Sequence, residues 1–171
     1  GLANNTMSLT AQYGTTKESI TMKDSGFIVK GFYDYSLTKE FIARLGAGIQ
    51  MFSVKGTTSA SICNNGESTS CEVGFTYLVG EAVAQYYLTD GGFKLWAGLG
   101  YHFLLAAAKK NSVPNLASDT STNQMISFGG GFDFYMSRNS FIPFSVLMGM
   151  FPGSSNVSAS TMIIQAGYGF G

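Results

Sequence analysis

Apolar and polar residues alternate with a period of two along most of the chain. Between Phe93 and Ala108 the odd positions through Leu105 are apolar, whereas the even positions include Lys94, Trp96 and His102. A helix would repeat every 3.6 residues, and one that crosses a bilayer would need about 20 apolar residues. The pattern therefore predicts a β-strand with one continuous apolar face and one face that carries polar groups.

Seven further stretches show the same alternation, so we predict eight strands within a single domain, residues 1–171. The strands are expected at 7–13, 27–35, 41–51, 77–88, 93–105, 126–136, 141–151 and 161–170. In the first of them Met7 and Leu9 belong to the apolar row, which we expect to face outward.

The predicted connections alternate in length. Short turns are expected at 36–40, 89–92 and 137–140, and longer polar loops at 14–25, 55–72, 109–123 and 152–160. An even number of strands, with short turns at one end and longer loops at the other, is typical of outer-membrane barrels. The predicted fold is all-β, an eight-stranded antiparallel up-and-down transmembrane β-barrel.

The composition is typical of a protein whose surface is largely shielded from water. Charged residues make up 12% of the chain, about half the fraction in a typical soluble domain. Lysine plus arginine equals aspartate plus glutamate, so the formal net charge is zero. Because phosphate backbones are bound by basic surfaces, nucleic acid is not an expected partner.

The charged residues within the predicted strands all lie opposite the apolar row. An eight-stranded barrel is just wide enough to be filled by side chains, and buried charges must be paired. We therefore expect a closed interior held by salt bridges, with the histidine as a member of the network. A polar pore and a catalytic histidine assisted by Ser127 or Ser145 remain alternatives, although the sequence places neither serine beside it. The expected interior residues are Lys30, Asp34, Arg44, Glu81, Lys94, Asp133 and His102.

Two cysteines, Cys63 and Cys71, flank a polar segment that contains glycine. No histidine lies nearby to complete a zinc site, so a local disulfide is expected in an oxidising compartment, with two free thiols as the alternative. The stretch FGGGFDF does not open a helix and is not a nucleotide-binding loop. The sequence therefore indicates no metal site and no cofactor.

In strand count, loop asymmetry and interior charges the chain resembles the small eight-stranded outer-membrane barrels of Gram-negative bacteria, the OmpA-transmembrane-domain, OmpX and Ail-like class. Its final segment, QAGYGFG, is similar to the alternating aromatic strand that the assembly machinery reads in that class, with Gln165, Gly167 and Phe170 in place. The usual final aromatic residue would fall one position after Gly171.

The resemblance implies a protein of the bacterial outer membrane with periplasmic termini and extracellular long loops. It also implies contact with outer-membrane lipids, including lipopolysaccharide, and with the barrel-assembly machinery. Members of the class serve as anchors, adhesins, immune-evasion factors or lipid A-modifying enzymes. No enzyme motif of the class carries over to residues of this chain.

We therefore expect a non-enzymatic monomer that supports the envelope and binds an extracellular or host-surface ligand through loops 55–72 and 109–123. The first alternative is a narrow channel for ions or small solutes lined by Lys30, Arg44, Glu81 and Asp133. A soluble, lipocalin-like lipid-binding barrel is the second. An enzyme acting on membrane lipid through His102 is the third.

Overall fold

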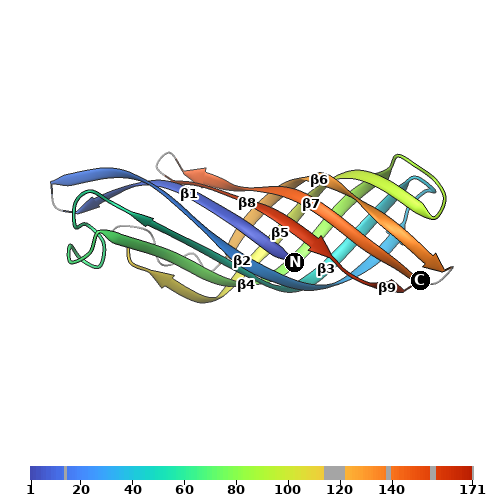
Figure 1. Cartoon of the computed structure of the whole chain (residues 1–171), viewed down its shortest axis with the longest axis horizontal. Helices are drawn as coiled ribbons and strands as arrows, with labels where there is room; N and C mark the ends of the chain where they lie inside the picture. The colour runs from blue at the N-terminus through green and yellow to red at the C-terminus, as the bar shows by residue number, and fades with distance from the viewer. Residues whose placement is uncertain (14, 114–121, 138–139, 155–156, 171) are drawn as a thin grey trace.

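The chain forms a barrel of long antiparallel strands (Figure 1). The computed structural model describes residues 1–13, 15–113, 122–137, 140–154 and 157–170. The described part of the chain contains no helix long and apolar enough to cross a membrane. Its strands are β1 (Leu2–Tyr13), β2 (Thr16–Ser36), β3 (Phe41–Thr57), β4 (Ser70–Tyr87), β5 (Phe93–Asn111), β6 (Thr122–Ser137), β7 (Ser140–Ser154), β8 (Val157–Ala166) and the short β9 (Gly169–Phe170).

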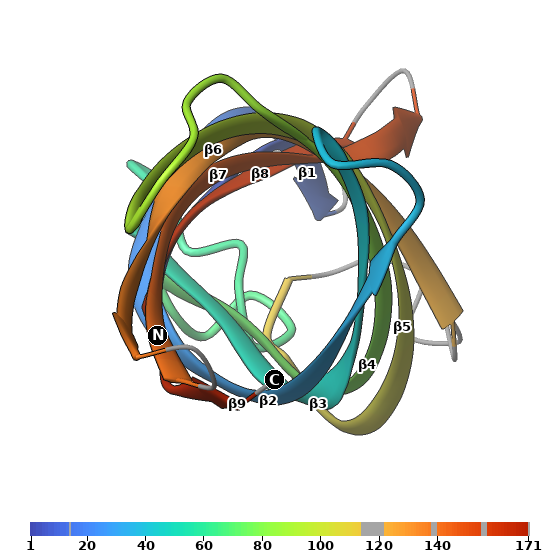
Figure 2. The ribbon, with the colours of Figure 1, turned by 90° about the vertical axis from the view of Figure 1, so that its right-hand side faces the viewer.

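Each of the first eight strands pairs with its neighbour in the sequence, and β1 pairs with β8 to close the ring. The closing ladder runs from Leu2 opposite Ile164 to Leu9 opposite Val157. β9 continues the line of β8 and pairs with β7. Figure 2 shows the ring from the end at which the short turns lie. The predicted eight-stranded antiparallel barrel is therefore confirmed.

From β2 to β8 the apolar row faces outward, as predicted. The exposed side chains of this outer band include Val29, Leu45, Leu99, Phe128 and Met148. On the same strands, Arg44, His102 and Asp133 are buried inside. A barrel that is apolar outside and charged inside has the polarity of a transmembrane barrel, because a soluble barrel would show the opposite.

The orientation predicted for the first strand is wrong. Met7 and Leu9 are only 7% and 5% exposed and point into the barrel, whereas Asn4 and Ser8 lie on the outer face. The reason is that the interior is itself apolar near the long-loop end of the barrel. There the polar residues lie outside, so an apolar row no longer marks the outer face.

Two of the predicted long loops are also wrong. Most of 14–25 belongs to the hairpin of β1 and β2, which pairs as far as Tyr13 opposite Thr16. Most of 152–160 belongs to β7 and β8. In both segments many outer side chains bear hydroxyl groups, as at Ser19, Thr21 and Ser158, a composition that is shared by loops and by strands that extend into water. Loop 58–69 does connect β3 and β4, and residues 114–121 of the other expected loop lie outside the described residues.

Candidate functional site: the interior network and the loop cap

A buried chain of polar side chains crosses the middle of the barrel. Lys30 on β2 forms an ion pair with Glu81 on β4. His102 on β5 lies directly opposite Glu81, with its Nδ1 3.0 Å from a carboxylate oxygen of Glu81. The other ring nitrogen, Nε2, is 2.8 Å from the hydroxyl of Ser127 on β6. Four strands thus contribute one group each to a single connected network, the Glu81 network.

Glycines on the neighbouring strands make room for this network. Gly46 faces Glu81, and a Cβ atom at Gly46 would lie 2.7 Å from a Glu81 carboxylate oxygen. Gly100 faces Ser127, and a Cβ atom there would lie 2.4 Å from the Ser127 hydroxyl. Any other residue at these positions would meet a buried polar group at less than van der Waals distance. Glycine at positions 46 and 100 therefore leaves the space that the side chains of Glu81 and Ser127 occupy.

The order serine, histidine, carboxylate is that of a hydrolytic triad. Ser127 and His102 are, however, both 0% exposed, and the two interior cavities described below are lined by other side chains. Glu81 is also bound to Lys30, which offsets its charge. With Ser127 and His102 both buried, the arrangement is a buried hydrogen-bond network that joins four strands.

A second network, the Arg44 network, lies nearer the short turns. Arg44 on β3 binds Asp34 on β2 through Nε and Nη2, each 2.7 Å from one carboxylate oxygen. Its Nη2 atom also lies 3.1 Å from Asp133 on β6, and the Tyr87 hydroxyl donates a hydrogen bond to the same Asp133 oxygen. The guanidinium group stacks 4.6 Å from the centre of the Phe32 ring.

Lys94 differs from the other predicted interior charges. Its ammonium group lies 5.1 Å from the ring centres of both Tyr87 and Tyr135. Although Lys94 faces Asp133 across β5 and β6, the structure shows cation–π contacts for this ammonium group. The predicted interior residues thus fall into two networks, with Lys94 held by the aromatic rings beside the second.

Other interior hydrogen bonds were not predicted from the sequence. Asn5 on β1 accepts a 2.8 Å hydrogen bond from Thr161 on β8, across the strand pair that closes the barrel. Asn123 donates a 2.7 Å bond to the Tyr77 hydroxyl. Asn5 lies before the predicted start of the first strand, and the outward orientation predicted for Met7 and Leu9 would have placed Asn5 outside as well, so its inward position was missed.

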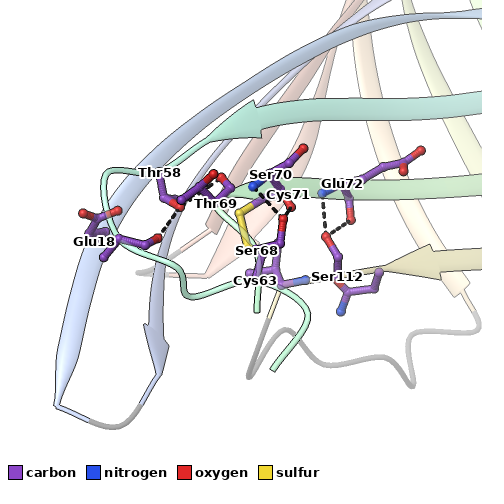
Figure 3. Close-up of a disulfide and its surroundings, with 12 residues drawn as sticks. Glu18, Thr58, Cys63, Ser68, Thr69, Ser70, Cys71, Glu72 and Ser112 are labelled. Atoms are coloured by element: carbon purple, nitrogen blue, oxygen red, sulfur yellow. Dashed lines mark hydrogen bonds between the residues drawn. A yellow bond between two sulfur atoms is a disulfide. The ribbon is translucent and has the colours of Figure 1, made fainter. Parts of the chain in front are cut away.

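A disulfide-bridged loop covers the long-loop end of the barrel (Figure 3). The expected disulfide between Cys63 and Cys71 is present. Both cysteines are buried with Ile62, which is 1% exposed, and with Val113 in the apolar cluster that fills this half of the interior. Figure 2 shows the loop across the far opening of the ring. Loop 58–69 together with Ser112 and Val113 is called the cap below.

Hydrogen bonds join the two parts of the cap and fasten it to β4 and β2. Asn64 N–H donates to the carbonyl of Ser112 at 2.8 Å, and Glu72 N–H donates to the Ser112 hydroxyl at 2.7 Å. Ser59 N–H donates to the Glu18 carboxylate of β2 at 3.2 Å. The reversal of the chain at residues 64–66 uses three successive residues with positive φ, Asn64, Asn65 and Gly66, which are residue types that tolerate this conformation.

Outside the apolar band, on the hairpin of β1 and β2, Asp24 has a lowered pKa. The main cause is the hydrogen bond donated by the backbone N–H of Ser25, and the hydroxyl of Ser53 and the ammonium group of Lys55 act in the same direction. The Lys55 ammonium group lies 3.6 Å from the carboxylate. Both side chains reach solvent, so the pair adds little stability.

Two cavities lie toward the short-turn end. One of about 190 Å³ is lined by Lys30, Arg44 and Glu81 together with residues of β7 and β8. The other, of about 520 Å³, lies at the mouth formed by the β2–β3 and β4–β5 turns. The polar half of the interior therefore contains space, and the described apolar cluster and the cap lie in the opposite half.

The fold and the distribution of polarity define the chain as a closed eight-stranded transmembrane-type β-barrel. No protein-family model matches the chain, and no curated protein matches it by sequence. Among solved structures it is similar to Ail, the attachment invasion locus protein of Yersinia pestis, at 12% identity with a TM-score of 0.37, over 99% of this chain and 95% of that one. A second structure, Ail in complex with the heparin analogue sucrose octasulfate, gives a TM-score of 0.36 at the same identity and coverage.

Proposed function

We propose that the chain is an integral protein of the bacterial outer membrane that supports the envelope and presents a rigid surface to the outside, without enzymatic activity. The observation that carries this proposal is the separation of polarity in the wall. Exposed apolar side chains such as Leu99 and Phe103 surround the barrel, while the charges at the same level point inward. An outward charge at the bilayer centre would cost about 2–4 kcal/mol.

The interior supports a structural role. Ion pairs of the Glu81 and Arg44 networks connect strands that are distant in the sequence, such as β3 and β6. Removing one partner of a buried pair leaves an uncompensated charge, so such networks hold a single arrangement of strands. In this proposal the short turns and the C-terminal end of the chain face the periplasm, whereas Gly1 lies midway along the wall (Figure 1), and β9 and the end of β8 are the segment read by the barrel-assembly machinery.

The proposed contact surface is the long-loop end. The hairpin of β1 and β2 extends beyond the apolar band, and its outer face carries Ser19, Thr21 and Lys23, all exposed. Beside it stands the cap, which the disulfide and the hydrogen bond from Ser59 to Glu18 hold in place. A rigid polar surface suits recognition of an extracellular or host-surface ligand. The apolar band and its polar border would contact outer-membrane lipids, including lipopolysaccharide.

Membrane fractionation and heat-dependent gel mobility test the membrane assignment. We expect the protein in the outer-membrane fraction, with unboiled protein migrating differently from boiled protein in SDS. A protein that is soluble without detergent and shows no mobility shift would contradict the proposal and favour the soluble lipid-binding barrel. For the contact surface, Ser19→Ala/Lys23→Ala should weaken binding of cells to host-cell glycans or matrix, whereas Ser140→Ala at the opposite end should not.

A narrow channel is the second candidate, and the cavity of about 190 Å³ lined by Lys30, Arg44 and Glu81 is the observation that favours it. Planar-bilayer recordings distinguish the two functions. A closed structural barrel should give no steady conductance, whereas a channel should give unit steps whose ion selectivity changes in Lys30→Gln.

A further inference from the structure

Lys94 on β5 is a cation that forms no ion pair among the described residues. The other predicted interior charges belong to the ion pairs of the Glu81 and Arg44 networks. Asp133 faces Lys94 across β5 and β6, but its Oδ2 atom is bound by Arg44 and Tyr87. The Oδ1 atom of Asp133 is buried and has no hydrogen-bond partner within the described chain, so the Lys94 ammonium group does not turn toward it either. The positive charge of Lys94 therefore has no direct counter-charge from the described side chains.

Two tyrosine rings hold the Lys94 ammonium group in place. The ring centres of Tyr87 on β4 and Tyr135 on β6 each lie 5.1 Å from the Lys94 Nζ atom. A ring face attracts a cation, but it does not accept the three N–H donors of an ammonium group as a carboxylate or phosphate oxygen does. The rings therefore fix the position of the charge and leave its donors for an acceptor that enters from the mouth.

The cavity of about 520 Å³ at the short turns opens onto Lys94, which is half-buried, and onto both tyrosines. Its volume falls within the range of small-molecule sites, about 300–1,000 Å³. Figure 2 looks into this mouth, with the β2–β3 and β4–β5 turns at its near rim. Leu37, Ile42 and the two tyrosine rings form apolar walls, and the charged residues of the lining are Lys39, Asp90 and Lys94. The cavity therefore combines apolar surface with a cation that is held in one position.

The charges around the cavity favour a singly charged anion. Two cations, Lys39 and Lys94, and one carboxylate, Asp90, line it, so the lining carries a formal net charge of +1. The Arg44 network behind the cavity holds two carboxylates and one guanidinium group. Its formal net charge of −1 would repel the second charge of a dianion. Charges in a partly buried site are screened less than charges in water, so both effects act on a bound ligand.

We propose that the mouth cavity is a binding site for a small amphipathic monoanion, a carboxylate attached to an apolar group. The carboxylate accepts hydrogen bonds from the Lys94 ammonium group, and the apolar group packs against Leu37 and Ile42. Lys39 at the rim attracts the anion from solvent. The site goes beyond the proposed structural role and does not depend on it. With the short turns toward the periplasm, the ligand would enter from the periplasm.

Methyl NMR of the full chain in lipid nanodiscs tests the site, with para-toluate as the probe. Titration should shift the methyl signals of Leu37 and Ile42 and leave that of Ile62 in the cap unchanged. Lys94→Gln should weaken the affinity at least about tenfold, because it removes a charge-assisted hydrogen bond. Lys94→Arg should retain binding, because it keeps a cation between the two rings. Lys55→Gln, which removes a lysine at the opposite end of the barrel, is the matched control and should leave the affinity unchanged.

Other results would overturn the proposal. Equal affinity for the uncharged para-toluamide would show that the cavity does not select an anion, and displacement of para-toluate by an equal concentration of inorganic phosphate would show that charge alone decides binding. Unchanged affinity in Lys94→Gln would assign the ligand to another group, and no shift at Leu37 and Ile42 would mean that the cavity holds only water. Heat-dependent gel mobility verifies that Lys94→Gln folds. If it does not fold, the comparison of para-toluate with para-toluamide in the parent and in Lys94→Arg still decides.

Discussion

Asp34 and Arg44 lie directly opposite each other on β2 and β3 and are joined by two parallel hydrogen bonds of 2.7 Å. Arg44 then reaches across the barrel to Asp133 on β6. One guanidinium group thus fixes the local register of a hairpin and connects it to the opposite wall. The stability of the barrel should depend on this residue more than on any exposed ion pair.

Arg44→Met should lower the free energy of unfolding by about 3–5 kcal/mol, because it leaves the buried carboxylate of Asp133 and the half-buried one of Asp34 without a cation. Urea titration in detergent, followed by the gel mobility of unboiled protein, measures the change. Lys55→Met, which breaks the solvent-exposed pair with Asp24, is the matched control and should cost less than about 1 kcal/mol. Equal losses in the two variants would contradict a structural role for the Arg44 network.

Ser127→Ala should cost about 1–3 kcal/mol, because it leaves the buried Nε2 atom of His102 without its hydrogen-bond partner. Glu81→Gln should cost about 3 kcal/mol or more, since it leaves the buried ammonium group of Lys30 without its counter-charge. The same urea titration compares the two. An assay for release of fatty acids from outer-membrane lipid should show no activity in either the parent protein or Ser127→Ala. Lipid turnover that disappears in Ser127→Ala while stability stays unchanged would reinstate the catalytic alternative.

The double substitution Cys63→Ser/Cys71→Ser should release the cap. The disulfide closes a short loop, and the chain-entropy model gives about 2–3 kcal/mol for its loss. We expect the loss to be local, so a protease added to intact cells or proteoliposomes should cut within loop 58–69 faster than in the parent. Reaction of each variant with a thiol reagent after denaturation verifies its cysteine content. Equal cleavage rates would show that hydrogen bonds alone hold the cap.

Leu99→Arg should destabilise the barrel in a lipid bilayer by about 2–4 kcal/mol, because the side chain, 65% exposed, faces outward from the middle of β5. Ser19→Arg, on the outer face of β2 beyond the apolar band, should change stability by less than about 0.5 kcal/mol. Unfolding by guanidinium in phospholipid vesicles measures both. If Leu99→Arg leaves the free energy of unfolding unchanged, the outer face of β5 lies in water and not in lipid.

Asp24→Asn tests the lowered pKa at the loop end. A carboxyl group whose pKa is lower in the folded than in the unfolded state, as at Asp24, stabilises the fold above its unfolded pKa and loses that contribution as the pH falls. The free energy of unfolding of the parent should therefore be higher than that of Asp24→Asn by less than about 1 kcal/mol at pH 6. This difference in the free energy of unfolding should vanish toward pH 2. A difference that grows on acidification would contradict the assignment.

The alternation of side chains was sufficient to predict the barrel and the inward side of seven strands. It failed at Met7 and Leu9, because an interior that changes from charged to apolar along its length reverses the pattern on the shortest predicted strand. It also predicted loops where the outer residues are hydroxyl-bearing, as at Thr21. The pairing partners could not be predicted, because the distance from His102 to Glu81 depends on strand register, and contact between Arg44 and Asp133 depends on closure of the ring.

The cap and the apolar cluster occupy one half of the interior, and the charged networks with their two cavities occupy the other. Among the described residues, the interior is therefore open at the short turns and covered by the cap at the disulfide end. Lys94 lines the cavity at the short turns, so a water-borne reagent that enters from this end should modify Lys94 before it meets the charged networks behind it. A change of sequence in the cap would alter how the opposite end is covered without altering a single strand.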